Sequence, residues 1–258
     1  MLFLFRKIRR SLTNSSGASS YLLYAIGEIV LVVIGIMIAV QIDNWNEQRN
    51  QRAKELHYLQ NLKKDLQINL IELDKYIENR IGLIQIAEEV LAYFDGKPLE
   101  QPELLFDKTL QIYTWKKYFQ SNNTYQELIN TGNFALITNE DIKNGLLDLE
   151  AQYRIMKAEE EHFRYDSEVA LYLPSYETTD IYKLYKNLMY RMTDGAQGED
   201  VTITISDYEP VLSDLRQKNG FLMAYFEFGA MNAQMEEMKR MSGEVIELID
   251  QELSGQIN

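Results

Sequence analysis

The sequence predicts an all-α protein, in which an N-terminal transmembrane helix continues into a long helix and an extracytoplasmic helical bundle. Three observations predict this fold. A 20-residue apolar run carries a single charge, apolar residues then recur at seven-residue spacing, and helix start and stop signals follow to the C-terminus. The expected parts are a basic cytoplasmic segment at 1–20, a transmembrane helix at 21–42 and an extracytoplasmic helical domain at 43–258.

The apolar run extends from Tyr21 to Val40, and Glu28 is its only charged residue. About 20 such residues are enough to cross a bilayer as a helix. Tyr24 and Trp45 lie where interfacial aromatic residues are expected. A buried core helix is disfavoured because the run has no polar face, and a cleaved signal peptide is disfavoured because no small-x-small cleavage site follows. An uncleaved signal anchor fits best.

A basic cluster ahead of the run predicts its orientation; it consists of Arg6, Lys7, Arg9 and Arg10. This cluster outweighs the mixed charges behind the run, so the positive-inside rule places the N-terminus in the cytoplasm. The expected location is therefore the inner (cytoplasmic) membrane, with the C-terminal domain in the periplasm. The basic segment either lies on the anionic inner leaflet or serves only as a topology signal.

One face of the predicted membrane helix combines small residues with the single carboxyl group. Steps of 100° per residue place the following side chains on that face: Ala25, Glu28, Val32, Gly35 and Ala39. Small residues four apart let two helix backbones approach closely, and an intramembrane carboxyl group is costly unless it faces protein, water or headgroups. We therefore expect this face to associate with a second copy or with a partner membrane protein. The alternatives are chance spacing with a carboxyl group in headgroup water, and a proton- or ion-handling role for Glu28.

Two stretches carry a family resemblance. Residues 24–47, preceded by the basic N-terminus, closely resemble an uncharacterised (domain of unknown function) family of single-span, N-terminally anchored envelope proteins of Bacteroidota. Residues 124–137, followed by Asn139 and Asp141, resemble a second recurrent element of that family. The resemblance implies architecture and host lineage. It implies no activity and no catalytic residue.

A long helix is predicted from about Asn44 to Phe94 by two series of apolar residues at seven-residue spacing. The first series is Leu59, Leu66, Leu73, Ala87 and Phe94, and the second is Leu70, Ile77, Ile84 and Leu91. Arg80 interrupts the first series. Three isoleucines widen the apolar face and favour a helical bundle over a two-stranded coil; they are Ile68, Ile71 and Ile81. Gly96 and Pro98 predict the end of the helix.

Further helices are predicted near 103–119, 124–130, 139–172, 179–192, 207–218 and 221–253. Thr124 and Thr138 each precede an acidic residue by three positions and are the expected N-caps. Pro174 is expected to end the third of these helices. The alternating run 201–206 has no partner strand, so an extended connector is expected there, and 193–200 is the expected mobile loop.

Composition excludes several kinds of site. The chain has no cysteine, which rules out disulfides, thiol catalysis and thiolate metal ligands. Its net charge is −13, and the first 50 residues are net basic, so the acidic charge lies in the domain that follows. Because nucleic-acid affinity comes mainly from Lys and Arg on phosphates, no nucleic-acid partner is expected.

The sequence contains one partial metal-binding motif and no motif for catalysis. Glu159 and His162 form a Glu-x-x-His of the kind that di-iron bundles use in pairs, but no second copy exists. The run 159–162 is therefore interpreted as a solvated acidic face. No Gly-x-Ser-x-Gly, phosphate-binding loop or dinucleotide fingerprint is present. The sequence predicts no catalytic, metal or cofactor-binding residue, and no cofactor.

Aromatic and methionine residues recur at helical spacing in the C-terminal half. The aromatic ones are Tyr172, Tyr176, Tyr182, Tyr185, Tyr190, Phe221, Tyr225, Phe226 and Phe228, and the methionines are Met231, Met235, Met238 and Met241. A ligand pocket or partner groove is one interpretation of the aromatic residues. A bundle core with hydroxyl groups at its rim is favoured, as is core packing of the methionines.

These observations predict a membrane-anchored, non-enzymatic interaction or scaffold protein of the cell envelope. Its expected partners are the membrane and either a second copy or a partner membrane protein, and its ligand is unknown. One alternative is an extracytoplasmic ligand-sensing domain that acts through a partner. Another is a stator-like or energy-coupling subunit that uses Glu28.

Overall fold

The structure, a computed structural model, describes residues 18–255, with side chains from residue 24 onward. The described part is helical and contains no strand, which confirms the all-α fold with a long N-terminal helix. It divides into two compact units, the first ending at His57 and the second beginning at Tyr58. Helix α2 (Ala18–Phe94) contributes to both units. The basic cluster of Arg6, Lys7, Arg9 and Arg10 lies outside the described residues.

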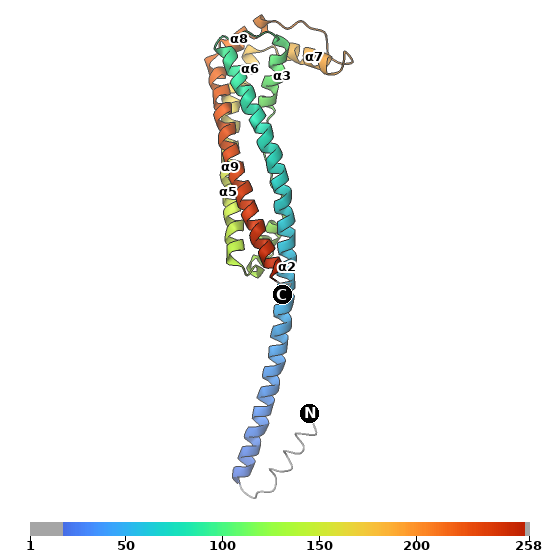
Figure 1. The fold of residues 1–258 in the computed structure, drawn as a ribbon, viewed down its shortest axis with the longest axis vertical. Helices are drawn as coiled ribbons and strands as arrows, with labels where there is room; N and C mark the ends of the chain where they lie inside the picture. The colour runs from blue at the N-terminus through green and yellow to red at the C-terminus, as the bar shows by residue number, and fades with distance from the viewer. Residues whose placement is uncertain (1–17, 256–258) are drawn as a thin grey trace. The chain divides into compact units, whose positions relative to one another are not determined.

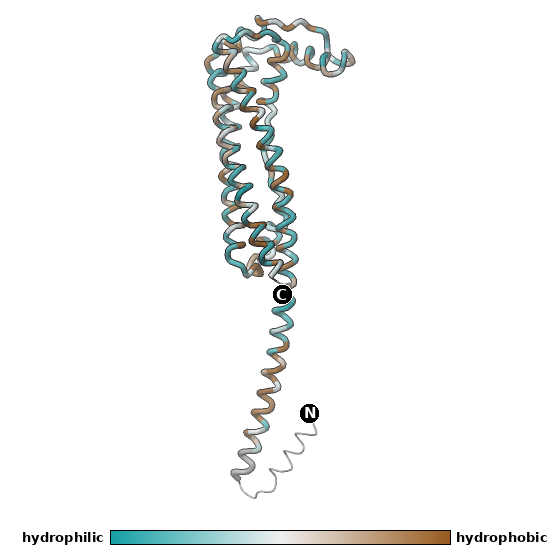
Figure 2. The backbone as a smooth tube through the Cα atoms, viewed as in Figure 1, coloured by the Kyte–Doolittle hydropathy of each residue, from teal (hydrophilic) through white to brown (hydrophobic). Residues whose placement is uncertain are grey.

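The described part of the first unit belongs entirely to α2. Every Ile, Leu, Val and Met side chain from Ile26 to Ile42 is between 46% and 65% exposed. Figure 2 shows this run of hydrophobic residues along the helix. Among the helices that the structure describes, α2 alone is long and apolar enough to cross a membrane, and none of its apolar window is buried. This exposure differs from the burial of the helices in the second unit.

Three long helices build the second unit: α2 from Tyr58, α5 (Glu140–Ser167) and α9 (Leu215–Ser254) (Figure 1). Ion pairs from Lys63 to Asp250 and from Lys218 to Asp95 show that α9 runs antiparallel to α2. The α5 and α9 helices are also antiparallel: Gly145 near the start of α5 faces Val245 near the end of α9, and Gln152 further along α5 bonds to Gln234 near the middle of α9.

The buried face of α2 agrees only in part with the two predicted series of apolar residues. The first series is buried as predicted from Leu59 to Ala87, whereas Phe94 is only partly buried, and Arg80 belongs to that series instead of interrupting it. In the second series Ile77 is buried as predicted, but Leu70, Ile84 and Leu91 are only partly buried. The buried positions beside these three lie one residue earlier, at Asn69, Leu83 and Val90. Polar side chains at positions 69 and 80 hid this register. The exposed isoleucines Ile68, Ile71 and Ile81 therefore do not widen the packed face, since each is about half exposed.

The end of α2 follows the prediction. Gly96 adopts a positive φ of 93°, and the Lys97 amide donates to the Ala92 carbonyl at 3.0 Å. A residue with a Cβ is strained in this left-handed conformation, whereas glycine adopts it without penalty. The chain then turns into α3 (Pro102–Tyr113), which has a proline in its first turn.

The segment 114–122 has no regular secondary structure, although a helix to residue 119 was predicted. It runs along α2 in the opposite direction, and α2 side chains satisfy its backbone. The Tyr76 hydroxyl donates to the Lys117 carbonyl at 3.1 Å. Asn69 donates to the Ser121 carbonyl at 2.8 Å and accepts from the Ser121 amide at 2.6 Å. These bonds replace those that a helix would have supplied.

Both predicted threonine caps were wrong. At α4 (Asn123–Asn130) the side chain of Asp65 in α2 accepts from the Thr124 amide at 3.0 Å, so a distant residue takes the place of a local cap. The short 3₁₀ helix η1 (Asn133–Leu136) follows. At α5 the cap is Asn139, whose side chain accepts from two amides of the first turn.

Pro174 does not end the helical path after α5. The chain continues through a π-helical turn, η2 (Glu168–Tyr172), into α6 (Leu173–Thr178), and the proline occupies the first turn of α6. There its missing N–H breaks no hydrogen bond. Next come α7 (Ile181–Met192), the loop 193–200 and the connector expected at 201–206, whose last two residues begin the 3₁₀ helix η3 (Ile205–Asp207). Helix α8 (Glu209–Leu212) precedes α9.

Helix α9 is continuous, although a break before residue 221 was predicted. Gly220 serves a close approach between helices instead of a break, because a Cβ there would lie 2.6 Å from Cδ2 of Leu171. The methionines confirm the prediction of core packing, since Met231, Met235 and Met238 are at most 2% exposed.

Two apolar clusters make up the core of the second unit, and a buried ion pair lies between them. Arg80 of α2 bonds to Glu160 of α5 at 2.5 Å, and their side chains are 1% and 0% exposed. Glu160 also accepts from the Tyr118 amide at 2.9 Å and from Lys157 at 2.6 Å. The prediction of a solvated face at 159–162 was therefore wrong for Glu160, because a distant arginine compensates its charge inside the core.

Candidate functional site

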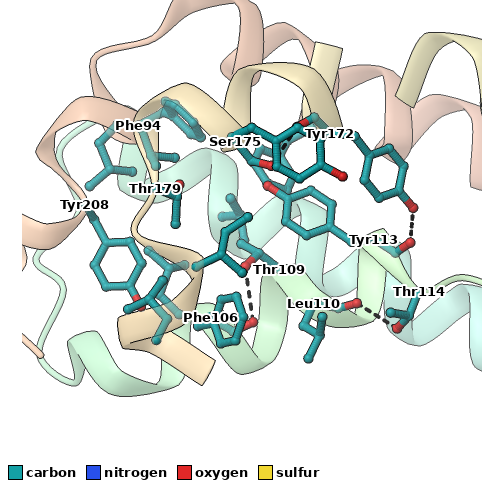
Figure 3. Close-up of a pocket in the computed structure, with 18 residues that line it drawn as sticks. Phe94, Phe106, Thr109, Leu110, Tyr113, Thr114, Tyr172, Ser175, Thr179 and Tyr208 are labelled. Carbon is teal, nitrogen blue, oxygen red and sulfur yellow. Dashed lines mark hydrogen bonds between the residues drawn. The ribbon is translucent and has the colours of Figure 1, made fainter. Parts of the chain in front are cut away.

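A cavity of about 260 Å³ lies at the end of the second unit where the short helices gather. Six segments supply its walls, as Figure 3 shows: Val90 and Phe94 of α2, Leu105, Phe106, Thr109, Leu110, Tyr113 and Thr114 at α3, Tyr172, Ser175, Tyr176 and Thr179 at η2 and α6, Ile181 and Leu184 of α7, Tyr208, Val211 and Leu212 at α8, and Phe221 of α9.

The π-helical turn helps to place the aromatic wall. Tyr172 is its last residue, and the tyrosine hydroxyl donates to the Tyr113 carbonyl at the end of α3. The two rings lie 5.4 Å apart, and Tyr113 lies 6.2 Å from Phe221. A π-helical turn is a rare, locally widened turn that often occurs at functional sites. Here the hydrogen bond from Tyr172 joins η2, which follows α5, to the end of α3.

The walls contain hydroxyl groups but no Asp, Glu, Lys, Arg or His. Four of these hydroxyls donate to backbone carbonyl groups, those of Thr109, Thr114, Tyr172 and Ser175. Thr109 donates to Phe106 at 3.2 Å, and Ser175 donates to Tyr172 at 2.7 Å. Among residues 18–255, no three His, Cys, Asp or Glu side chains are grouped to hold a metal ion.

Among the described residues that line the cavity, Tyr208 has the one fully buried hydroxyl without a hydrogen-bond partner. Its side chain comes from the turn before α8 and reaches toward Phe106 of α3 in Figure 3. The residue is 3% exposed, and its hydroxyl oxygen has no hydrogen-bond partner within the described chain. Burial raises the pKa of Tyr208, and the nearby Phe106 backbone only partly offsets this without forming a well-aligned hydrogen bond. The hydroxyl is therefore a neutral donor at physiological pH.

Replacing Tyr208 by Phe should stabilise the ligand-free protein by about 1 kcal/mol, because the change removes a buried polar group that lacks a partner. Urea unfolding of the full chain in detergent, followed by circular dichroism, measures this difference. The control is Tyr118→Phe, which removes a second unpartnered buried hydroxyl outside the cavity and should act in the same direction. Destabilisation by Tyr208→Phe alone would contradict the assignment.

The structure places the predicted membrane-helix face in one continuous helix. Ala25, Glu28, Val32, Gly35 and Ala39 all belong to α2, and no described atom lies within 4 Å of a Cβ built on Gly35. The last four of these residues are exposed. No described residue of another helix joins Glu28 to form a site.

The predicted aromatic cluster is divided between three environments. Tyr172, Tyr176 and Phe221 line the cavity, which partly favours the pocket interpretation. Phe228 is fully buried in the core, as the favoured interpretation expected. The remaining exposed rings belong neither to the core nor to the cavity: Tyr182, Tyr185 and Phe226 are between 50% and 69% exposed.

Among the cavity residues that the sequence analysis missed are Thr109, Tyr113 and Tyr208. Thr109 and Tyr113 belong to α3, whose last residue precedes the first residue of the C-terminal aromatic cluster by 59 positions. A buried position in a predicted helix was the only signal that Thr109 and Tyr113 carried. Tyr208 lies just before the short helix α8, and no sequence pattern marked it as a site residue.

Comparison with known proteins supplies the family. Residues 28–184, more than half of the chain, match the model of a family of unknown function (DUF6090). The match contains residues 124–137 and most of 24–47, the two stretches on which the resemblance was based. No curated protein and no solved structure is detectably similar. The chain therefore belongs to the family of unknown function DUF6090.

Proposed function

We propose that this protein is a membrane-anchored, non-enzymatic interaction or scaffold protein of the cell envelope. Residues 1–20 are then cytoplasmic, 21–42 cross the inner membrane and the domain that follows is periplasmic. The observation that carries the proposal is the apolar segment from Ile26 to Ile42, whose side chains are about half exposed or more in the structure. A helix whose exposed side chains are apolar is stable in the hydrocarbon core of a lipid bilayer.

Cysteine labelling tests anchoring and orientation together, because the native chain has no cysteine. In intact spheroplasts, a membrane-impermeant maleimide should label Ser213→Cys, whereas Ser11→Cys should react only after permeabilisation. Carbonate washing should leave both variants in the membrane pellet. Release by carbonate would contradict the anchor, and the reverse labelling pattern would contradict the orientation.

Association through the membrane helix gives a second test. Gly35→Ile should lower the association constant of crosslinkable oligomers about fivefold, as expected for a loss of roughly 1 kcal/mol at a small-residue contact. Gly27→Ile is the matched control, because Gly27 lies on another face of the same helix. A Cβ added at either glycine has no described side chain or backbone of another element within 4 Å, so both variants should fold. Equal crosslinking yields for the two variants would argue against this face.

A scaffold role also requires a partner of the second unit. Crosslinking in native membranes, followed by affinity purification of the full chain, should recover a second copy or a partner membrane protein. Recovery of the uncrosslinked single chain alone, at several crosslinker lengths, would count against the scaffold role.

Ligand sensing is the second function that we propose, and the cavity is the observation that favours it. The domain would bind a small molecule and act through a partner protein. Filling the cavity with Leu110→Trp should change how much partner copurifies if sensing and partner binding are coupled. A partner yield that responds to neither ligand nor cavity filling would contradict sensing while leaving the scaffold role intact.

A further inference from the structure

We propose that the cavity beside η2 and α6 binds an uncharged, largely apolar small molecule that accepts one hydrogen bond from Tyr208. This inference rests on the second proposed function, ligand sensing, and it names the class of ligand. Four properties of the cavity support it: its size, the absence of charge, the pairing of its hydroxyl groups and its access to solvent.

The size of the cavity limits the ligand. An engineered apolar cavity of about 150 Å³ is large enough to hold one benzene molecule. A cavity of about 260 Å³ therefore accommodates a molecule about the size of two fused rings with a small substituent. A nucleotide or a phospholipid is too large, and a metal ion finds no charged ligand on the walls.

The absence of charge in the walls selects neutral molecules. No acidic or basic side chain lines the cavity, and aromatic and aliphatic carbon makes up most of its surface. Transferring an ionised group into such surroundings without a counter-charge costs many kcal/mol. A carboxylate or an ammonium group therefore cannot enter, whereas an aromatic ketone, ester or quinone-like molecule can.

The pairing of hydroxyl groups identifies the polar contact. Thr109, Ser175 and Tyr172 donate to backbone carbonyl groups, so their hydrogens are already committed. The hydroxyl of Tyr208 is buried at the cavity wall and has no such acceptor. A ligand carbonyl or ether oxygen supplies the missing acceptor. One such hydrogen bond favours the oxygen-containing ligand over its hydrocarbon analogue by about three- to tenfold.

Access is provided where the wall meets solvent. Tyr176 of α6 lines the cavity and is 69% exposed, so this part of the wall lies at the protein surface. Thr114 at the end of α3 is also exposed, and it lies in the same lining. A small molecule reaches the cavity between α3 and α6 without unfolding the long helices.

Protection of a single introduced cysteine tests the proposal in the full chain, reconstituted in lipid nanodiscs. Ser175→Cys places the thiol on the cavity wall, and Ser213→Cys is the matched control. Both serine hydroxyls donate to a helix carbonyl, but Ser213 is exposed and lies outside the cavity. The rate of alkylation by N-ethylmaleimide is measured by mass spectrometry with and without 2-acetylnaphthalene, a neutral ketone. Thr109→Cys provides a second reporter on the opposite wall.

The expected result is at least tenfold slower alkylation of Ser175→Cys and Thr109→Cys at saturating ketone, with no change for Ser213→Cys. Adding Tyr208→Phe should raise the half-protecting ketone concentration about three- to tenfold. It should leave protection by 2-isopropenylnaphthalene, the hydrocarbon of the same shape, unchanged. Thermal unfolding of each variant verifies that it is folded.

Two results would overturn the proposal. If the ketone protects the control as well as the cavity reporters, or protects none of them, the cavity does not bind this class of molecule. If Tyr208→Phe weakens ketone and hydrocarbon equally, the hydrogen bond is not formed. Neither result bears on the anchor or on scaffold assembly, which the cysteine topology and crosslinking experiments measure separately.

Discussion

Glu160→Gln should lower the free energy of unfolding of the second unit by about 3 to 5 kcal/mol, because it leaves the charge of Arg80 buried without a counter-charge. Burial already lowers the pKa of Arg80, and Glu160 opposes this effect. An arginine does not lose its proton in a protein, so the variant cannot relieve the cost by becoming neutral. Urea unfolding of the full chain in detergent measures the difference.

The two halves of the pair should not be equivalent. Arg80→Met leaves Glu160 with the Lys157 ammonium and the Tyr118 amide, so its cost should be smaller than that of Glu160→Gln. The double variant Arg80→Met with Glu160→Leu removes both charges, and it should lose less than the sum of the single variants. Glu161→Gln is the control, since Glu161 is an exposed neighbour whose pairs with Lys117 and Arg164 lie at the surface. An equal loss for Glu160→Gln and Glu161→Gln would contradict a buried pair.

Phe228→Ala should cost about 3 to 5 kcal/mol of unfolding free energy, as is usual for truncating a fully buried phenylalanine. Its ring lies 4.8 Å from the ring of Phe163 and 6.2 Å from that of Trp115, so truncation opens a cavity between α9, α5 and the segment after α3. Thermal unfolding in detergent should show a midpoint lower by roughly 6 to 20 °C for a domain of this size.

The same helix offers a matched control two residues away. Phe226 is 59% exposed, so Phe226→Ala should change the unfolding free energy by less than about 0.5 kcal/mol. The two variants remove the same atoms from one helix and differ in burial. Similar losses for both would mean that Phe226 is covered in the assembled protein, and a small loss at Phe228 would contradict its place in the core.

Local sequence signals predicted the parts of the fold that depend on neighbouring residues. The apolar series of α2, the left-handed Gly96 and the methionine stripe of α9 all follow from spacing along one helix. The segment 114–122 did not, because side chains some 40 to 60 residues earlier hold its backbone. The predicted caps of α4 and α5 were wrong for a related reason. The nearby threonine hydroxyls do not accept from the first amides of these helices, because Asp65 does so at α4 and Asn139 at α5.

The candidate site was predictable only in part. Helical spacing brought Tyr172, Tyr176 and Phe221 to attention, and these residues do line the cavity. Tyr208 and Tyr113 enter it from segments that tertiary structure alone brings near. The buried pair shows the same limit, because an arginine in an apolar series and a glutamate in an acidic run each have an ordinary local explanation. Only the packing of α2 against α5 joins them.

The antiparallel packing of α9 on α2 also sets when this protein can fold. Contacts between the two helices join residues as far apart as Lys63 and Asp250, which are separated by 187 positions. At a synthesis rate of about 5 to 20 residues per second, the apolar stripe of α2 leaves the ribosome roughly 10 to 40 s before its last partner does. During that interval α9 does not yet cover the leucines of α2, so we expect the nascent chain to depend on a chaperone.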